Sequence, residues 1–192
     1  MRLAIFGGTF DPIHEAHLAV ARAAAARCAL DQVLFVPAAR PPHKTGATQA
    51  PYEDRVTMIE LACQDEPRFV SSRLEQGAAR SYSIRTIEAV RVTLAPGGPL
   101  FFLIGADAFA EIRTWLRWRD VLAAVEFIVA SRPGHSYQTP PGARVHRLDT
   151  LALAISSSEV RRRLARGAAH GALPPAVLAY IRQRGLYAAP PG

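Results

Sequence analysis

The sequence is poor in cysteine, because its 192 residues include only Cys28 and Cys63. Both lie in alanine- and leucine-rich segments with a helical pattern, and their separation matches no metal-binding motif. This scarcity excludes a cysteine-based zinc site. We therefore expect two small buried thiols in a reducing cytosol.

Long apolar segments are also missing. No stretch of the sequence approaches the roughly 20 uncharged apolar residues that a membrane-spanning helix needs. At the N-terminus, Arg2 precedes only four apolar residues before the first glycine pair, which is not the layout of a signal peptide. These absences favour a cytoplasmic protein with no membrane partner.

Two well-known phosphate-binding fingerprints are absent as well. The glycines that follow the first apolar segment, in "AIFGGTFDP", are not arranged as G-x-G-x-x-G, and G-x-x-x-x-G-K-[ST] occurs nowhere. Both the dinucleotide-binding fingerprint and the P-loop are therefore disfavoured.

Acidic residues are outnumbered by basic ones. The chain has 23 Lys and Arg against 16 Asp and Glu, so that its formal net charge is +7 and its pI is about 10.2. This excess fits a nucleic-acid binder, and it equally fits a site for phosphorylated small molecules. The hydrophobic content of 49% is ordinary, and 192 residues suffice for one domain with a sizeable core.

Short apolar segments alternate with longer segments of helical periodicity. The short ones are rich in Val, Ile, Leu and Phe, and most are apolar on both faces, as strands of a buried parallel sheet are. The predicted strands are 2–6, 32–36, 68–72, 100–104 and 126–130, and the predicted helices are 15–29, 51–65, 82–94 and 106–124. This alternation predicts a Rossmann-like, doubly wound α/β fold with a mostly parallel sheet. Ligands of such folds bind beyond the carboxyl ends of the strands.

The last part of the chain has a different pattern. A possible short strand at 143–147 is followed by a helix that begins at "SSSEVRRRL" and by a final helix in "PPAVLAYIRQRGLY". We expect a single domain over 1–187, with its main α/β part over about 1–150 and a helical C-terminal extension over about 151–187. The tail at 188–192 is expected to be frayed.

Several residues with chemical potential follow the first predicted strand. Gly7 and Gly8 would let the backbone turn close to a ligand's phosphates, although an ordinary strand-to-helix turn also favours glycine. Asp11, before a proline, suits capping of the next helix rather more than catalysis. His14 and His17 lie on one side of the first helical turn, where two imidazoles could donate hydrogen bonds to a phosphate. Their spacing does not match the zinc motif H-E-x-x-H and no third ligand is evident, so we expect no metal site in the protein.

Two distant segments carry a resemblance to a known family. The segment "GGTFDPIHEAH" resembles the G-x-F-D-P-x-H-x-G-H signature of the H-x-G-H nucleotidyltransferases, and "ISSSEVR" at 155–161 matches their second signature, I-S-[ST]-[ST]-x-[IV]-R. Between the two, in order and at similar spacing, lie "PPHK", "SYSIRT", "GAD", "TWLRW" and "RPG". "LPPAVLAYIRQRGLY" extends the match over nearly the whole chain. Within this superfamily the chain most resembles the bacterial nicotinate-mononucleotide adenylyltransferases of NAD biosynthesis.

The resemblance implies that the adenylyl group of ATP is transferred to nicotinate mononucleotide, with release of pyrophosphate and with Mg²⁺ on the triphosphate. It implies catalytic roles for His14, His17 and Arg161. The residues that it places at ATP are Gly7, Gly8, Thr9, Phe10, His14, His17, Ile155, Ser156, Ser157 and Arg161. The residues that it places at nicotinate mononucleotide are Lys44, Ser83, Asp107, Trp115 and Arg132.

Some of these residues also have a structural interpretation. Ser156 suits the N-cap of a helix as well as a phosphate contact, and Asp107 could cap the helix that follows the strand at 100–104. Trp115 could stack on the nicotinate ring or belong to the core. Lys44 could reach a phosphate from its loop or be solvated.

The chain departs from the family pattern at three positions. Ala16 replaces the glycine of H-x-G-H, Arg85 stands where an acidic residue is frequent, and Leu116 stands where an aromatic residue is common. Because alanine is small and favours helix, we expect Ala16 to tighten a contact without abolishing activity. Arg85 and Leu116 concern the substrate-binding segments.

Two other functions stay open. Phosphopantetheine adenylyltransferases share the opening motif, but His14, "PPHK" and "TWLRW" count against them. A non-catalytic nucleic-acid-binding module would explain the pI and "RRRLAR", but it need not keep both histidines and Arg161. We therefore expect ATP and nicotinate mononucleotide as partners, no nucleic acid, and a monomer or small homo-oligomer.

Overall fold

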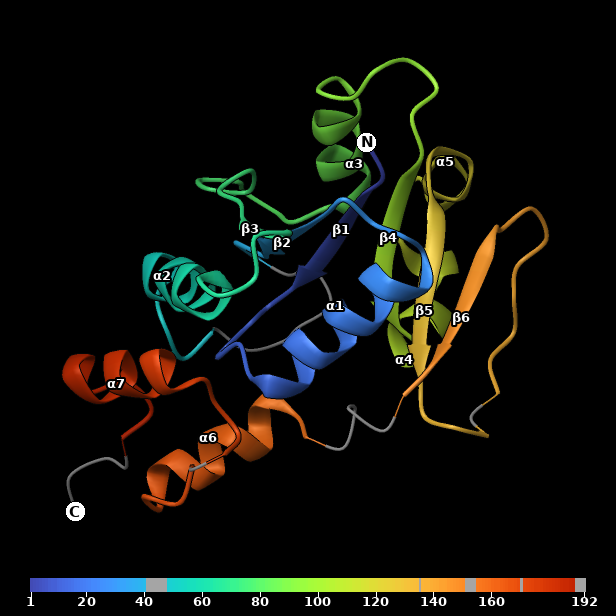
Figure 1. Ribbon diagram of the computed structural model, residues 1–192. Helices are drawn as coiled ribbons and strands as arrows, with labels where there is room; N and C mark the ends of the chain where they lie inside the picture. Colours follow the sequence, from blue (N-terminus) through green and yellow to red (C-terminus); the bar gives the residue numbers. More distant parts are fainter. Residues whose placement is uncertain (41–47, 135, 151–154, 170, 189–192) are drawn as a thin grey trace.

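The computed structural model describes residues 1–40, 48–134, 136–150, 155–169 and 171–188 (Figure 1). The strands are β1 (Leu3–Gly8), β2 (Gln32–Pro37), β3 (Phe69–Ser71), β4 (Leu100–Gly105), β5 (Glu126–Ser131) and β6 (Val145–Asp149). The helices are α1 (Glu15–Arg27), α2 (Tyr52–Cys63), α3 (Ser83–Arg91), α4 (Ala106–Ala110), the 3-10 helix η1 (Ile112–Thr114), α5 (Trp118–Ala124), α6 (Ser157–Ala165) and α7 (Pro175–Arg184). None of the helices described has the length and the apolar composition needed to cross a membrane.

The six strands form one parallel sheet in the order β3-β2-β1-β4-β5-β6. The chain winds outward from β1 through β2 to β3, returns to the centre at β4, and winds outward again through β5 to β6. This topology confirms the predicted Rossmann-like, doubly wound α/β fold. The winding direction reverses between β1 and β4, which is where such sheets open a crevice for ligands.

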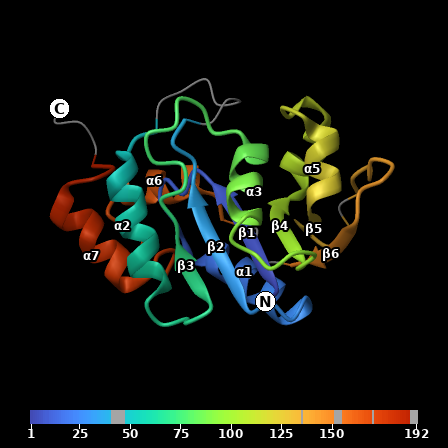
Figure 2. The same cartoon turned by 90° about the horizontal axis from the view of Figure 1, so that it is seen from above.

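Helices cover both faces of the sheet, and Figure 2 shows α1 on one face and α3 and α5 on the other. The sheet has a hydrophobic core on each face, and alternate residues of β1 belong to one or the other. Ala4 and Phe6 pack with residues of α1, α2, α6 and α7. Leu3 and Ile5 pack with residues of α3, α4 and α5. Because both faces of the central strands are buried in this way, these strands are apolar along their length.

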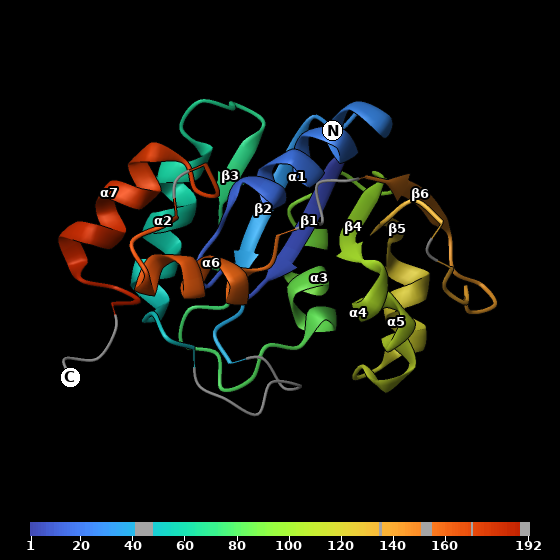
Figure 3. The same cartoon turned by 90° about the horizontal axis from the view of Figure 1, so that it is seen from below.

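The C-terminal helices pack on the first of these cores, with α7 beside α2 (Figures 2 and 3). The buried carboxylate of Asp54 in α2 accepts a hydrogen bond from the Tyr180 hydroxyl at 2.7 Å and another from Arg184 Nε at 3.1 Å. α7 ends at Arg184, and its C-cap residue, Gly185, adopts a left-handed conformation (φ 63°). Residues 189–192 of the tail that we expected to be frayed lie outside the described residues.

Two predicted boundaries are wrong. The single helix expected over 106–124 is divided into α4, η1 and α5, because Trp115 is extended (φ −75°, ψ 146°) and Arg117 is left-handed (φ 52°, ψ 42°). The ring of Trp115 packs edge-on against that of Phe102, 5.9 Å away, and this tertiary contact favours the break in the helix. The short strand expected at 143–147 spans Val145–Asp149 instead, and it pairs with β5 as the outermost strand of the sheet.

The burial of β4 generates a stability prediction. Leu103 lies in a central strand and is completely buried, so we expect Leu103→Ala to lower the free energy of unfolding by about 2–5 kcal/mol through the lost burial and the cavity it leaves. The matched control is Leu74→Ala, because the Leu74 side chain is exposed and its loss should change stability by less than about 0.5 kcal/mol. Urea denaturation of both variants measures the difference, and equal effects would contradict the assigned core.

Candidate active site

The site lies where β1 and β4 end, at the point where the winding of the sheet reverses. Gly7 and Gly8 close β1, and Gly105 closes β4. A Cβ atom on Gly8 would lie 2.9 Å from the ring of Phe10, so this position requires glycine for a close approach of the next turn. At Gly7 the same atom would make an ordinary contact of 3.5 Å with Phe102.

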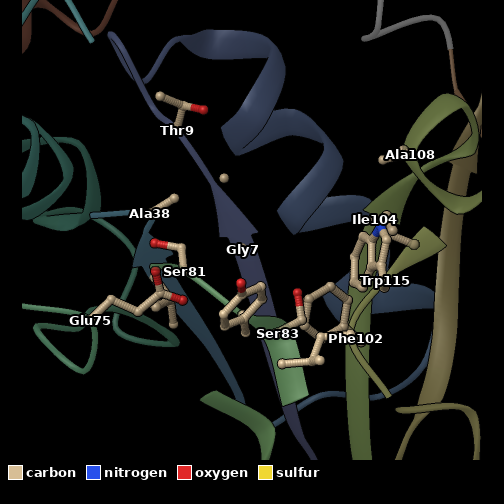
Figure 4. Close-up of a pocket in the computed structure, with 15 residues that line it drawn as sticks. Gly7, Thr9, Ala38, Glu75, Ser81, Ser83, Phe102, Ile104, Ala108 and Trp115 are labelled. Atoms are coloured by element: carbon tan, nitrogen blue, oxygen red, sulfur yellow. The ribbon is translucent and has the colours of Figure 1, made fainter. Parts of the chain in front are cut away.

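Two cavities open at this edge of the sheet. The first, of about 280 Å³, is the α3-side cavity, whose walls include Gly7, Gly8, Thr9, Glu75, Ser81, Tyr82, Ser83, Phe102 and Trp115. Figure 4 shows Glu75 and Ser81 on one side of it and Trp115 on the other. The second, of about 260 Å³, is the α1-side cavity, whose walls include Phe6, His14, Ala16, His17, Ile155, Ser156 and Ser157. Ile104 and Gly105, at the end of β4, line both cavities.

His14 and His17 form a stacked pair at the start of α1. Their ring centroids are 3.7 Å apart and their planes differ by 21°. His14 is the N-cap residue, and its backbone N–H donates to Nδ1 of His17 at 3.3 Å. Because Nδ1 accepts this bond, the proton of a neutral His17 ring is on Nε2, which makes that nitrogen a hydrogen-bond donor.

The His14 side chain is only 2% exposed, and neither of its ring nitrogens has a hydrogen-bond partner among the described residues. Burial lowers the pKa of His14 to about 4, so that its ring is neutral at pH 7. A buried polar group without a partner destabilises a protein by about 1–3 kcal/mol. A ligand in the α1-side cavity that accepts hydrogen bonds would remove this penalty.

The second sequence motif docks directly on the first, as Figure 3 shows from the position of α6 near the ends of β1 and β2. Ser157 Oγ donates to the carbonyl of Pro12 at 3.1 Å, and Arg161 Nη1 donates to the carbonyl of Asp11 at 2.7 Å. The Ser156 side chain accepts from the N–H of Glu159 at 3.3 Å, so its role as a helix cap is confirmed. Ser156 also lines the α1-side cavity, so it could cap the helix and contact a ligand at the same time.

The other predicted residues are distributed around this site. Phe10 is buried beneath His17, with ring centroids 5.0 Å apart, and supports that ring. Asp107 and Arg132 are exposed and are absent from the described walls of both cavities, and the N-cap of α4 is Gly105, so Asp107 does not cap that helix. Lys44 lies outside the described residues.

The expectation that Asp11 caps α1 is wrong. Two residues separate it from the N-cap residue, His14, and its carboxylate accepts instead from the backbone N–H groups of Gln49 (2.9 Å) and Ala50 (3.1 Å). The hydroxyl of Tyr187 donates to the same carboxylate at 2.6 Å. Asp11 thus joins three segments that are distant in the sequence.

Two side chains near the site, those of Arg55 and Glu75, were not predicted from the sequence. Arg55 is 1% exposed and donates to the carbonyls of Thr9 (2.7 Å) and Ala38 (2.9 Å), at the ends of β1 and β2. Arg55 lies one helical turn before the buried Ile59, and this spacing could have indicated that Arg55 is on the buried face of α2. Glu75, in the α3-side cavity, accepts from the Thr86 hydroxyl at 2.7 Å, and no local pattern marked it.

Comparison with known proteins agrees with this geometry. Residues 5–163 match the model of the cytidylyltransferase-like family. A probable nicotinate-nucleotide adenylyltransferase of Solibacter usitatus is 66% identical over 97% of this chain and 100% of its own. The chain belongs to the nicotinate-nucleotide adenylyltransferase family.

Further relatives extend the similarity. A probable nicotinate-nucleotide adenylyltransferase of Thermus thermophilus is 42% identical over 97% of this chain and 100% of its own. A solved structure of the Plasmodium falciparum nicotinic acid mononucleotide adenylyltransferase complexed with NaAD superposes with a TM-score of 0.79. That structure covers 97% of both chains at 19% identity and so establishes the common fold.

The burial of His14 predicts a pH dependence of stability in the absence of nucleotide. The pKa of His14 is about 4 in the folded protein and 6.5 ordinarily, so the unfolded chain binds more protons between these values and stability falls as the pH is lowered from 6.5 to 4. The loss that His14 contributes should approach about 3 kcal/mol.

Urea denaturation across this pH range measures the effect. His14→Gln should flatten the dependence relative to the unmodified protein, whereas His146→Gln, at a half-buried histidine of β6, should leave it in place. Identical pH profiles for the unmodified protein and His14→Gln would show that His14 titrates normally.

Proposed function

We propose that the protein transfers the adenylyl group of ATP to nicotinate mononucleotide. An oxygen of the 5′-phosphate of nicotinate mononucleotide attacks the α-phosphorus of ATP, the bond from that phosphorus to the bridging oxygen breaks, and pyrophosphate leaves. The product is nicotinate adenine dinucleotide. The observation that supports this best is the histidine pair: the buried ring of His14, which has no hydrogen-bond partner among the described residues, stacks on the ring of His17, whose Nδ1 accepts a backbone hydrogen bond and leaves Nε2 to donate.

ATP would occupy the α1-side cavity. The Nε2–H of His17 and a ring N–H of His14 would donate to phosphate oxygens, and the N-terminus of α6 beyond Ser156 presents backbone N–H groups to the same cavity. Arg161 Nη2, which donates to Ser158 Oγ at 3.2 Å, would turn to the leaving pyrophosphate while Nη1 keeps its bond to Asp11. Because the attacking phosphate is already an anion, the reaction needs donors that stabilise phosphoryl charge rather than a general base.

Nicotinate mononucleotide would occupy the α3-side cavity. Trp115 would stack on the nicotinate ring, and the backbone N–H groups at the start of α3, around Ser83, would meet the carboxylate. Asp107 and Arg132 would contact the bound nucleotide from the rim, and Lys44 would add a further positive charge. Since Ile104 and Gly105 line both cavities, the phosphate of one substrate would lie close to the α-phosphorus of the other at the end of β4.

The Mg²⁺ ion would arrive with ATP. Among the described residues, no group of three or more His, Cys, Asp or Glu side chains could hold a metal ion. The oxygens of the triphosphate would supply its ligands, in keeping with the preference of Mg²⁺ for phosphates and water. The resident residues contribute hydrogen-bond donors and orientation.

One test of this function concerns the molecule that accepts the adenylyl group. Pyrophosphate release from Mg-ATP should be fast with nicotinate mononucleotide, slower with its amide and absent with phosphopantetheine, because the relatives are nicotinate-nucleotide adenylyltransferases and α3 begins at the cavity wall. A coupled pyrophosphate assay with each acceptor supplied alone measures this. Release only with phosphopantetheine would overturn the assigned acceptor, and release with none would indicate a protein that binds without catalysis.

The second prediction concerns His17. His17→Ala should lower kcat by about 10²- to 10³-fold, as the loss of one transition-state donor commonly does. His146→Ala is the matched control, because that histidine pairs with Glu126 on β5, away from both cavities. A folded His17→Ala protein with unchanged kcat would remove His17 from the mechanism.

A further inference from the structure

In the turn that leads from β1 to the histidine pair, most backbone carbonyls accept hydrogen bonds from residues outside the turn. The donors come from β2 and its loop, from α2 and from α6, although these elements are far apart in the sequence. The bonds are Ala38 N–H to Gly8 O (2.8 Å), Arg55 Nη1 to Thr9 O (2.7 Å), Arg161 Nη1 to Asp11 O (2.7 Å) and Ser157 Oγ to Pro12 O (3.1 Å). The turn is therefore a clamped element rather than a free loop.

The side chain of Asp11 is the second point of attachment. It is 5% exposed, and its two oxygens accept from the N–H groups of Gln49 and Ala50 and from the hydroxyl of Tyr187 at 2.6 Å. Burial and the adjacent Asp11 carboxylate raise the pKa of Tyr187 far above its ordinary value. The hydroxyl consequently stays protonated and serves as the donor in this bond.

The backbone of Tyr187 is strained in a way that this bond explains. Tyr187 has a φ of 59°, in the left-handed region that bulky residues rarely adopt. It follows the left-handed Gly185 at the end of α7. A strained conformation persists where surrounding contacts over-determine it, and here the hydroxyl reaches across the domain to a buried carboxylate.

The same carboxylate also balances the charge of Arg55. That guanidinium is 1% exposed; burial lowers its pKa, and among the surrounding charges Asp11 does most to favour the charged form. Arg55 in turn holds the carbonyl of Thr9. Since the peptide unit is planar and trans, this bond also directs the N–H of Phe10 away from Arg55. The conformation of the turn thus depends on where Asp11 lies.

We propose that Tyr187 is a positioning residue for adenylyl transfer, because it holds Asp11 and through it the turn that presents the histidine pair to ATP. Tyr187 itself would touch neither substrate. The inference rests on the proposed function, since the turn matters for turnover only if phosphates bind beside His14 and His17. It predicts that the C-terminal segment contributes to the use of ATP and not to the binding of nicotinate mononucleotide.

The test removes one hydroxyl group. Tyr187→Phe should lower kcat/KM for ATP about tenfold, in line with the effect of small misplacements in an active site, while the KM for nicotinate mononucleotide changes less than about twofold. The matched control is Tyr180→Phe, which deletes a hydroxyl of the same C-terminal region that also bonds to a buried carboxylate, Asp54, at 2.7 Å. That carboxylate lies in α2, and Tyr180→Phe should leave the kinetics with both substrates unchanged.

A double-mutant cycle with Asp11→Asn makes the test specific. If Tyr187 acts through Asp11, the double variant should lose little more activity than Asp11→Asn alone, whereas independent effects would multiply. Multiplying effects, or equal losses in Tyr187→Phe and Tyr180→Phe, would overturn the inference. If Tyr187→Phe does not fold, Asp11→Asn carries the test by itself: a loss confined to ATP supports the inference, and equal losses for both substrates overturn it.

Assays of the unmodified protein distinguish a failure of the proposed function from a failure of the role proposed for Tyr187. An unmodified chain that releases no pyrophosphate with nicotinate mononucleotide refutes the proposed function, and the inference falls with it. An active unmodified chain whose Tyr187→Phe variant keeps the unmodified kcat/KM for ATP refutes the inference alone.

Discussion

The docking of α6 onto the turn after β1 is the contact on which the rest of the site depends. Two hydrogen bonds, from Ser157 and Arg161 to the carbonyls of Pro12 and Asp11, join segments about 150 residues apart. The burial of Val160 on the same helix offsets the entropy of closing so long a loop. Without this docking, the histidine pair would still line the α1-side cavity, but Ser156 and Ser157 would be missing from its wall.

The doubly wound sheet supplies the frame for that contact. The two cavities lie beside its reversal point, and Ile104 and Gly105 at the end of β4 line both of them. Local rules are broken around this point: the two ring nitrogens of His14 are buried without hydrogen-bond partners among the described residues, and Phe10 adopts a left-handed conformation. Such exceptions are expected to gather where a site is built for a ligand.

Much of the fold was predictable because its signals are local. Apolar runs such as 100–104 predicted the buried strands. The helix expected over 106–124 failed because the packing of Trp115 on Phe102 outweighs helical periodicity there. The role of Asp11 failed for a similar reason, since its partners, Gln49, Ala50 and Tyr187, come from distant segments.

The sequence by itself determined the element types, the parallel α/β class and the motifs that carry the resemblance, because these depend on residue periodicity and short-range spacing. Only the tertiary structure decided that Arg55 and Tyr187 bond to the turn after β1 and that Nδ1 of His17 accepts from the backbone N–H of His14. A hydrogen bond between remote segments leaves no periodic trace in the chain. It follows from the sheet order, which brings the ends of β1, β2 and β4 together beneath α6.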